Sequence, residues 1–166
     1  MTLSSAVWAT ASGDGILNRW LFAGGDRQVR DVMVFGDSGI LACTPPDRRP
    51  EWEATKKRLV WPNGATATAY SAHDPESLRG PQFDAAWADE LAKWKKAEVA
   101  WDMLQFALRL GPNPQAVVTT TPRPVPLLKR LMADEATRLT RMATSARPGG
   151  HRRMPRKSTV SCGFCR

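Results

Sequence analysis

Two adjacent carboxylates, Asp89 and Glu90, end an apolar run that begins at Phe83 and is interrupted only by Asp84. An Asp at the end of a strand can hold Mg²⁺, largely through the water shell of the ion, because Mg²⁺ dehydrates reluctantly. A Glu beside it can orient and polarise an attacking water molecule. The pair therefore has the residue types that phosphate hydrolysis requires, one carboxylate for the metal and one for the nucleophile.

A second polar cluster follows a β-branched run farther along the chain and consists of Thr119, Thr120 and Thr121. In α/β sheets, ligands bind outside the carboxyl ends of the strands. If the two runs are neighbouring strands, the carboxylates and the threonines meet at one rim of the sheet, and we expect Asp89 to lie close to Thr120. The threonines could then sense a γ-phosphate, as in the Walker B and sensor arrangement of P-loop motors. The simpler alternative is that Asp89 caps the helix that contains Leu91 and Trp94, because acidic residues stabilise a helix N-terminus.

Hydrophobic periodicity and turn signals predict the elements that would position these residues. The order is a strand, a helix, a β-hairpin, a strand, a helix, a strand and a helix, over residues 20–25, 26–34, 58–72, 83–88, 97–111, 117–121 and 125–136. Two apolar strands separated by a helix imply a right-handed crossover and a parallel pair. The fold class predicted from this order is α/β.

Several local features make this prediction specific. The dipeptide Asn63-Gly64 suits a hairpin turn, because both residue types accept positive φ. Residues 44–52 contain three prolines and are predicted to be a loop. Asp26 is the expected N-cap of the first helix. One apolar face of the helix at 97–111 is predicted to consist of Val99, Met103, Phe106 and Leu110.

The net charge of +8 is unevenly distributed. Six of the 24 Lys and Arg residues and none of the 16 acidic residues follow Ser145. Residues 143–166 are therefore expected to form a disordered basic tail. Such a tail can hold nucleic acid through phosphate contacts, or it can be a solvated terminus without a partner. Its CGFC motif, Cys162 and Cys165, lacks the second pair of ligands that a zinc site needs, so two reduced thiols are expected.

Nothing in the sequence indicates a membrane segment. No apolar run approaches the ~18 residues that a transmembrane helix requires. The N-terminus lacks the basic start and the apolar stretch of a secretory signal. We therefore expect no membrane partner and a cytoplasmic location.

The segments RLVWPNGATATAYSAHDPESLRGPQFDAAWADELAKW and WDMLQFALRLGPNPQAVVTTTPRPVPLLKRL resemble the large terminase subunit of tailed phages, prophages and gene transfer agents. The resemblance runs from about Arg30 to about Met142. That family is the ATP-driven motor and nuclease of DNA packaging. It implies a P-loop NTPase (RecA-like) sheet, the cofactors Mg²⁺ and ATP, and three partners: double-stranded DNA, the portal protein and the small terminase subunit.

The resemblance also implies roles for individual residues. Asp89 resembles the Walker B aspartate, which is the metal position, and Glu90 resembles the catalytic glutamate. The coupling motif, which links hydrolysis to movement, corresponds to Thr119, Thr120 and Thr121. Arg79 falls where the family keeps an arginine near the nucleotide or an adjacent subunit, and its alternative role is a surface ion pair.

The sequence departs from the family at two places. It contains no Gly-Lys-Thr or Gly-Lys-Ser, with which the Walker A loop ends. Because residues 20–25 resemble the strand before that loop and residues 26–34 resemble a later stretch, we expect an internal deletion between Gly25 and Asp26. The acidic nuclease domain is also missing after Met142. The expected organisation is a weakly patterned segment at 1–25, a partial terminase ATPase domain at 26–142 and the basic tail at 143–166.

The leading interpretation is a truncated terminase large subunit that keeps Walker B and the coupling motif and is inactive alone. One alternative is a non-catalytic basic nucleic-acid-binding protein that uses Trp residues and the tail. This alternative is weakened because Trp61, Trp87 and Trp101 occupy positions predicted to be buried. The other alternative is a remnant without a function, since a sheet that lacks strands exposes edges and apolar faces.

Overall fold

The computed structural model describes residues 19–24, 28–141 and 158–163. Within this part of the chain, the strands are β1 (Arg19–Gly24), β2 (Glu51–Glu53), β3 (Arg58–Val60), β4 (Thr66–Ser71), β5 (Ala85–Asp89), β6 (Gln115–Thr120), β7 (Thr137–Arg141) and β8 (Ser158–Gly163). The helices are the π-helix η1 (Val29–Val34), α3 (Ile40–Cys43), α4 (Ala97–Ala107), α5 (Pro126–Ala133) and the 3₁₀ turns η2 (Pro46–Arg48), η3 (Pro75–Leu78) and η4 (Leu91–Lys93). None of these helices is long and apolar enough to cross a membrane.

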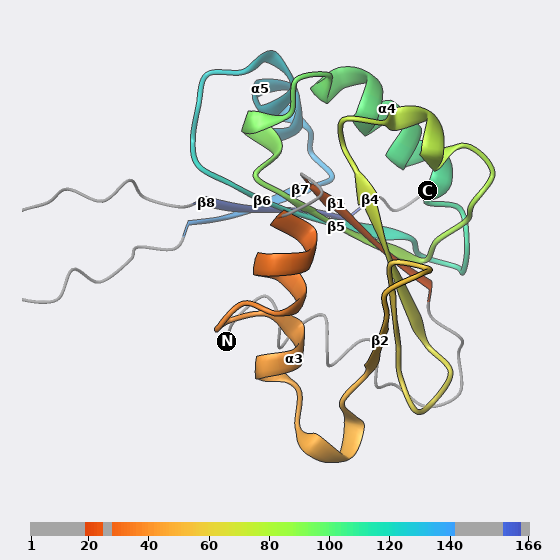
Figure 1. Ribbon diagram of the computed structural model, residues 1–166. Helices are drawn as coiled ribbons and strands as arrows, with labels where there is room; N and C mark the ends of the chain where they lie inside the picture. The colour runs from red at the N-terminus through yellow and green to blue at the C-terminus, as the bar shows by residue number, and fades with distance from the viewer. Residues whose placement is uncertain (1–18, 25–27, 142–157, 164–166) are drawn as a thin grey trace, which may run out of the picture.

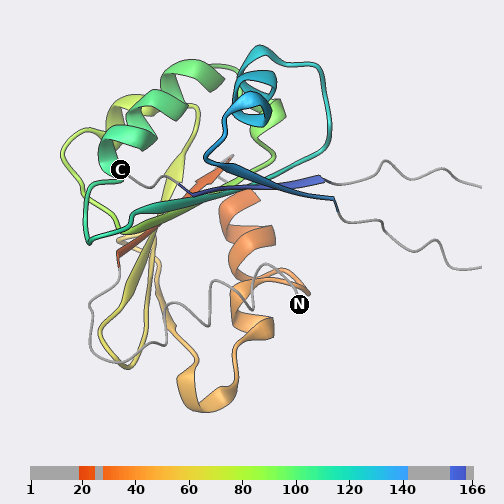
Figure 2. The same cartoon turned by 180° about the vertical axis from the view of Figure 1, so that it is seen from behind.

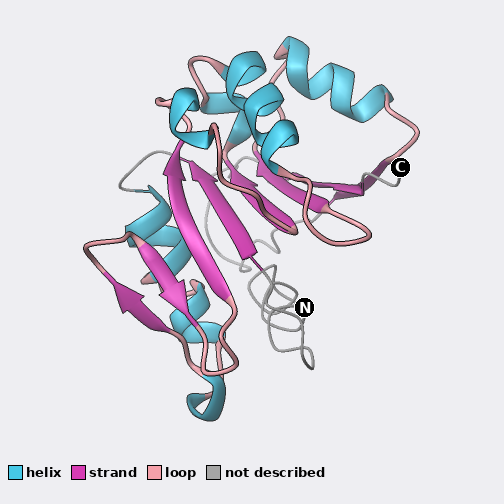
Figure 3. Cartoon of the chain, turned by 90° about the vertical axis from the view of Figure 1, so that its right-hand side faces the viewer, coloured by secondary structure: helices cyan, strands magenta, loops and turns pink. Residues whose placement is uncertain are grey.

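All the strands belong to one mixed sheet with the order β2-β3-β4-β1-β5-β6-β8-β7. Its central strands β4, β1, β5 and β6 run parallel to one another. The strand arrows of Figure 3 show this shared direction. β5 and β6 are joined through α4, which confirms the predicted parallel pair with a helical crossover. The prediction of an α/β architecture is confirmed at this level.

Helices cover both faces of the sheet (Figures 1 and 2). α4 and α5 lie on one face, and η1 and α3 lie on the other. β5 serves both cores, because successive strand residues point to opposite faces. Ala86 and Ala88 belong to the core under α4 and α5, whereas Ala85 and Trp87 belong to the core under η1 and α3. This alternation decides which way each residue at the end of the strand points.

The predicted hairpin is formed by β3 and β4, which pair antiparallel. Gly64 has φ +85°, and the side-chain oxygen of Asn63 accepts a hydrogen bond from the Ala65 amide at 3.0 Å. The Trp61 amide donates to the Ala65 carbonyl at 2.9 Å and closes the turn. Trp61, Trp87 and Trp101 are all buried, as predicted.

Two expectations about local structure were wrong. The loop predicted over residues 44–52 contains η2, and its end enters β2, in which Trp52 alternates with Glu51 and Glu53 and pairs with β3. The helix predicted at 97–111 does form, as α4, but two residues of its predicted apolar face are exposed, Val99 at 48% and Phe106 at 70%. Met103 of that face is partly buried and packs against the core. The buried face consists of Ala100, Trp101, Leu104 and Ala107. These residues recur at helical spacing as well, and small Ala side chains let the helix approach its neighbours closely.

The tail expected to lack structure contains a strand. β8 pairs antiparallel with β6 on one side and with β7 on the other. β-branched residues such as Thr159 and Val160 favour this extended conformation, and β6 presents a free edge to it. Residues 142–157 and 164–166 lie outside the described part, as do the proposed deletion point at Gly25–Asp26 and the Asp26 N-cap.

Candidate functional site

The carboxylate pair and the threonines meet at one rim of the sheet, as the sequence predicted. Asp89 is the last residue of β5 and lies in register opposite Thr119 of β6. The Thr119 hydroxyl donates to the Asp89 carboxylate, with 2.5 Å between Oγ1 and Oδ1. The contact arises because both residues lie on the same face at matching positions of paired strands. The threonine that contacts Asp89 is therefore Thr119, and Thr120 is the next residue of β6.

The Asp89 carboxylate is held from both sides. The Thr119 hydroxyl also accepts a hydrogen bond from the indole nitrogen of Trp87, at 2.9 Å, so its own proton is directed to Asp89. Trp87 precedes Asp89 by two positions, which places both side chains on one face of β5. The other carboxylate oxygen accepts from the side-chain amide of Gln28, at the start of η1, at 2.8 Å. The result is a half-buried carboxylate with a fixed orientation.

Glu90 turns the chain sharply out of the strand. Its backbone is left-handed, with φ +51° and ψ +40°, which is uncommon for a residue with a long side chain. The residue is only 6% exposed. Its carboxylate pairs with the ammonium of Lys93 at 3.2 Å and lies 3.4 Å from the Thr121 hydroxyl through each of its two oxygens. Backbone strain of this kind persists only where the surroundings hold it, and it concentrates at functional sites.

Thr120 holds the turn and not the carboxylates. It is 3% exposed, and its hydroxyl accepts a hydrogen bond from the Ala92 amide of η4 at 3.0 Å. The indole nitrogen of Trp94 donates to the Asp89 carbonyl at 3.0 Å and fixes the same turn from the other end. The three threonines therefore make different contacts: Thr119 contacts Asp89, Thr121 contacts Glu90, and Thr120 accepts a hydrogen bond from the turn that follows Glu90.

Two alternatives from the sequence can be compared with this geometry. The N-cap position of η4 is Glu90, and it makes no side-chain capping hydrogen bond. Asp89 is therefore not a helix cap, and its oxygens are used across the sheet. Arg79 follows η3 and pairs with Glu76 at 2.8 Å, with both side chains about two-thirds exposed. This contact is the surface ion pair that the sequence offered as its alternative role.

Sequence reasoning missed four residues that shape the site: Gln28, Trp87, Lys93 and Trp94. Trp87 could have been found from its two-residue spacing to Asp89, and Lys93 from its three-residue spacing to Glu90. The contact of Gln28 spans 61 positions in the chain, and no local pattern signals it.

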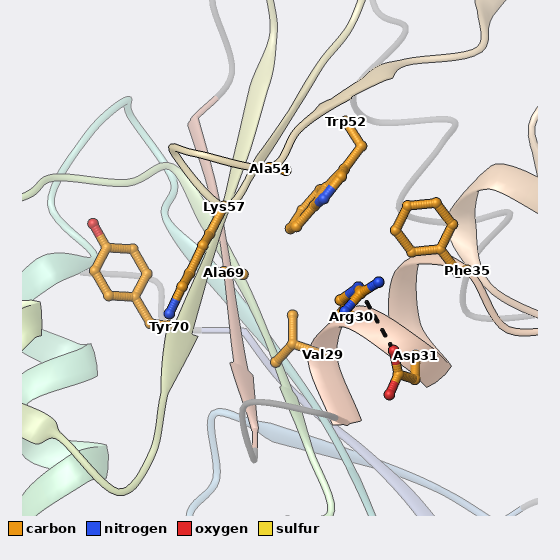
Figure 4. Close-up of a pocket in the computed structure, with 9 residues that line it drawn as sticks. All are labelled: Val29, Arg30, Asp31, Phe35, Trp52, Ala54, Lys57, Ala69 and Tyr70. Carbon is orange, nitrogen blue, oxygen red and sulfur yellow. Dashed lines mark ion pairs between the residues drawn. The ribbon is translucent and has the colours of Figure 1, made fainter.

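A cavity of about 530 Å³ lies elsewhere, between η1 and the end of β4 (Figure 4). Neither carboxylate and none of the three threonines lines it. Within the described residues, no group of three or more His, Cys, Asp or Glu side chains could hold a metal ion. A metal at the rim would therefore rely on one or two carboxylates together with water and substrate oxygens, which is the usual mode for Mg²⁺.

Comparison with known proteins gives a family whose description matches most of the chain. The family described as "Terminase large subunit, T4likevirus-type, N-terminal" matches residues 1–158. Among solved structures, the large terminase ATPase domain of Thermus phage P74-26 matches at 20% identity with a TM-score of 0.44, and the match covers 68% of this chain. The chain spans about half, 51%, of that ATPase domain.

Two other similarities are less informative. A Haemophilus influenzae protein, HI0767, described as a methylase, matches at 15% identity with a TM-score of 0.48, over 100% of this chain and 90% of that one. At TM-scores below 0.5 neither structural likeness bears on function. A stretch of 28 residues is 82% identical to formimidoylglutamate deiminase of Pseudomonas aeruginosa, and it covers 17% of this chain and 6% of that enzyme.

Proposed function

The chain belongs to the family of T4-type large terminase subunits, as part of their N-terminal region, and on this premise we propose that its rim is the metal and water end of an ATPase site. The observation that carries the proposal is the hydrogen bond of 2.5 Å between Thr119 and Asp89. It joins the two clusters that, by resemblance to the family, correspond to Walker B and to the coupling motif.

Asp89 has the chemistry of a Mg²⁺ ligand. Its carboxylate, the hydroxyl of Thr119 and the side chain of Gln28 supply the hard oxygen atoms that this ion prefers. Both carboxylate oxygens already accept one hydrogen bond, which leaves lone pairs for water molecules of a hydrated ion. The residues therefore fit Mg²⁺ held through its water shell. When bound, the ion supplies positive charge against the phosphates of a nucleotide.

Glu90 is the residue that we assign to the attacking water. Its buried carboxylate is oriented by Lys93 and Thr121, and the left-handed backbone aims the side chain away from the strand direction. A carboxylate so placed can accept a hydrogen bond from water and polarise it. Lys93 and Thr121 both contact Oε2, whereas Oε1 has a contact with Thr121 and keeps a lone pair that can accept a hydrogen bond from the water.

The threonines supply the mechanical connection that the family's coupling motif implies. Thr119 and Thr121 touch the two carboxylates directly, and Thr120 holds the turn that carries Glu90. A change in the hydrogen bonds of Asp89 would therefore reach β6 directly, and a change at Glu90 would reach Thr121, the residue that follows β6. α5 follows β6 after a short connection and would receive the displacement next.

By itself the chain is expected to hydrolyse ATP at no measurable rate. The 166 residues contain no Gly-Lys-Thr or Gly-Lys-Ser, so the amides and the lysine that cradle a triphosphate are not supplied. Loss of a single charged group in phosphoryl transfer can cost ~10³–10⁵ in rate. Double-stranded DNA, a portal protein and a small terminase subunit are the partners that membership of this family suggests, with Arg79 as a contact for nucleotide or for an adjacent subunit.

Phosphate release from ATP in the presence of Mg²⁺ tests the proposal, with Glu90→Gln as the matched variant. Equal, background rates for both proteins are expected. Turnover by the natural chain that disappears in Glu90→Gln would show that the chain is active and would overturn the predicted inactivity. Turnover that persists unchanged in Glu90→Gln would remove Glu90 from the proposed role.

A further inference from the structure

The tip of the β3–β4 hairpin carries a dipeptide that can react without any enzyme, Asn63-Gly64. It is the only Asn-Gly in the sequence, and both of its residues are exposed. The residues that flank the tip, Trp61 and Ala65, are buried, at 2% and 0% exposed. An Asn side chain that is followed by glycine is open to attack by the next backbone nitrogen, because glycine has no Cβ to hinder the approach.

The reaction is loss of the side-chain amide through a cyclic imide. The Gly64 amide nitrogen gives its proton to hydroxide and forms a bond to Cγ of Asn63. The bond from Cγ to Nδ2 breaks, and Nδ2 takes up a proton from water and leaves as ammonia. Water then opens the imide at either carbonyl carbon. Opening at Cγ leaves aspartate at position 63, and opening at the main-chain carbonyl carbon leaves isoaspartate, in which the main chain runs through Cβ and Cγ.

The folded turn uses both reacting groups for hydrogen bonds. The Gly64 amide donates to the Trp61 carbonyl at 2.9 Å. The Asn63 side-chain oxygen accepts from the Ala65 amide at 3.0 Å. The imide has no N–H at the Gly64 nitrogen, so the first bond must break before the ring can close. The second bond restrains the side-chain rotation that brings Cγ to this nitrogen.

The strands on both sides of the tip keep the turn closed. The Trp61 amide donates to the Ala65 carbonyl at 2.9 Å. One pair farther along, Leu59 of β3 lies opposite Ala67 of β4, and both are completely buried in the core under η1 and α3. The turn is therefore anchored in the core through each strand. Segments held in this way open together with the unit to which they belong, so the tip opens fully only when the hairpin does.

We propose that Asn63 is a site of spontaneous deamidation that the folded hairpin protects, so that the chain is modified there when it unfolds. The isoaspartate product adds one methylene group to the main chain of a turn in which Gly64 already has φ +85°. Turn length and type fix the register of a hairpin. The longer turn therefore disfavours the pairing of Leu59 with Ala67, and a chain modified while unfolded refolds less well. The inference does not depend on the roles proposed for Asp89 and Glu90.

Peptide mapping by mass spectrometry tests the proposal, because replacement of an amide by a carboxylate changes the mass of one peptide. The chain is incubated at mildly alkaline pH, folded in buffer or unfolded in guanidinium chloride. Asn63 is expected to react at least about tenfold more slowly in the folded chain, since two hydrogen bonds must open first. Asn113 is the internal control, because the nitrogen of Pro114 carries no proton and cannot form the imide. It should remain unmodified in both conditions.

A proline variant tests whether the turn itself protects Asn63. Pro62→Gly keeps the Asn-Gly sequence and removes the residue that presets the backbone of the turn. It should speed the reaction of the folded chain and leave the rate in guanidinium chloride unchanged. Pro124→Gly, at an exposed proline outside the hairpin, is the matched control and should change neither rate.

Refolding tests the consequence of the modification. Chain that has been modified in guanidinium chloride should recover less far-ultraviolet circular dichroism on dilution than unmodified chain treated in parallel. Asn63→Asp carries the same charge on a main chain of normal length, and it should refold better than the modified chain. Absence of reaction at Asn63 in guanidinium chloride, or reaction at Asn113 at the same rate, overturns the site. Equal rates in the folded and unfolded chain overturn the protection, and full refolding of the modified chain overturns the consequence.

Discussion

The hydrogen-bond chain from Trp87 through Thr119 to Asp89 makes a quantitative prediction about Thr119→Val. Valine has nearly the same shape and suits a strand equally well, so the substitution removes one hydroxyl and little else. The substitution removes the acceptor of the Trp87 indole N–H and the donor to the Asp89 carboxylate. Trp87 is buried, at 7% exposed. Both partners then lose the hydrogen bond that they share with Thr119.

The expected cost follows from the burial of each partner. Removing the Thr119 acceptor from a buried indole N–H costs about 1–3 kcal/mol. The bond to the carboxylate is charge-assisted and is worth about 1.5–3 kcal/mol when buried, but Asp89 is only half-buried and water can replace part of it. We therefore expect the free energy of unfolding to fall by about 2–4 kcal/mol. Urea unfolding followed by far-ultraviolet circular dichroism measures this change.

Thr119→Ser is the matched control, because it keeps the hydroxyl and removes only a methyl group; its cost should stay below about 1 kcal/mol. A double-mutant cycle with Trp87→Phe should show a coupling free energy of about 1 kcal/mol or more between the two side chains. A Thr119→Val protein within about 0.5 kcal/mol of the natural chain, with no coupling to Trp87, would refute this reasoning.

Three further predictions test other parts of the structure. In urea unfolding, Glu90→Gly should be more stable than Glu90→Ala by about 1 kcal/mol, because glycine adopts a left-handed backbone without steric cost. A more stable Ala variant would contradict the observed φ of +51°. Gly111→Ala should lower the free energy of unfolding by at least about 1 kcal/mol, because Gly111 has φ +71° and a Cβ there would lie 2.9 Å from Asp84 Oδ1. Its control in thermal unfolding is Gly80→Ala. Gly80 also has positive φ, but a Cβ there would meet open space, so this variant should lose less stability. Burial raises the pKa of Tyr70 above its ordinary value of 10.0. Because Tyr70 is the only tyrosine, the tyrosinate absorbance of the folded chain should titrate above pH 10, and a midpoint at or below 10 would contradict its burial. The free energy of unfolding should be unaffected by this group below pH 10 and should fall as the pH rises through the raised pKa.

Local chemistry made the hairpin and the rim predictable from the sequence. Asn63-Gly64 specifies its turn by backbone preference alone, and an apolar run and a β-branched run specify the strands on each side of α4. The meeting of Asp89 with the threonines follows from parallel strands that share a carboxyl rim. These features depend on residues close in sequence or on a rule that fixes strand direction.

The features that failed depend on packing between distant segments. Both faces of α4 carry residues at helical spacing, and only the approach of the sheet decides that Ala100 and Leu104 are inside while Val99 and Phe106 are outside. Strand register decides that Thr119 is the threonine opposite Asp89, and residues 115–121 alone do not specify that register. β8 forms because β6 has a free edge, which cannot be known from residues 158–163 alone.

The measurement that tests the central claim most directly is Mn²⁺ binding, followed by electron paramagnetic resonance of the free ion, with Mn²⁺ in place of Mg²⁺. If Asp89 holds the metal, the natural chain binds one ion at the rim, Asp89→Asn weakens that binding at least about tenfold, and Asp31→Asn, which removes an exposed carboxylate near the cavity, leaves it unchanged. Equal Mn²⁺ affinity in the natural chain and in Asp89→Asn would contradict the assignment of this rim as a metal site.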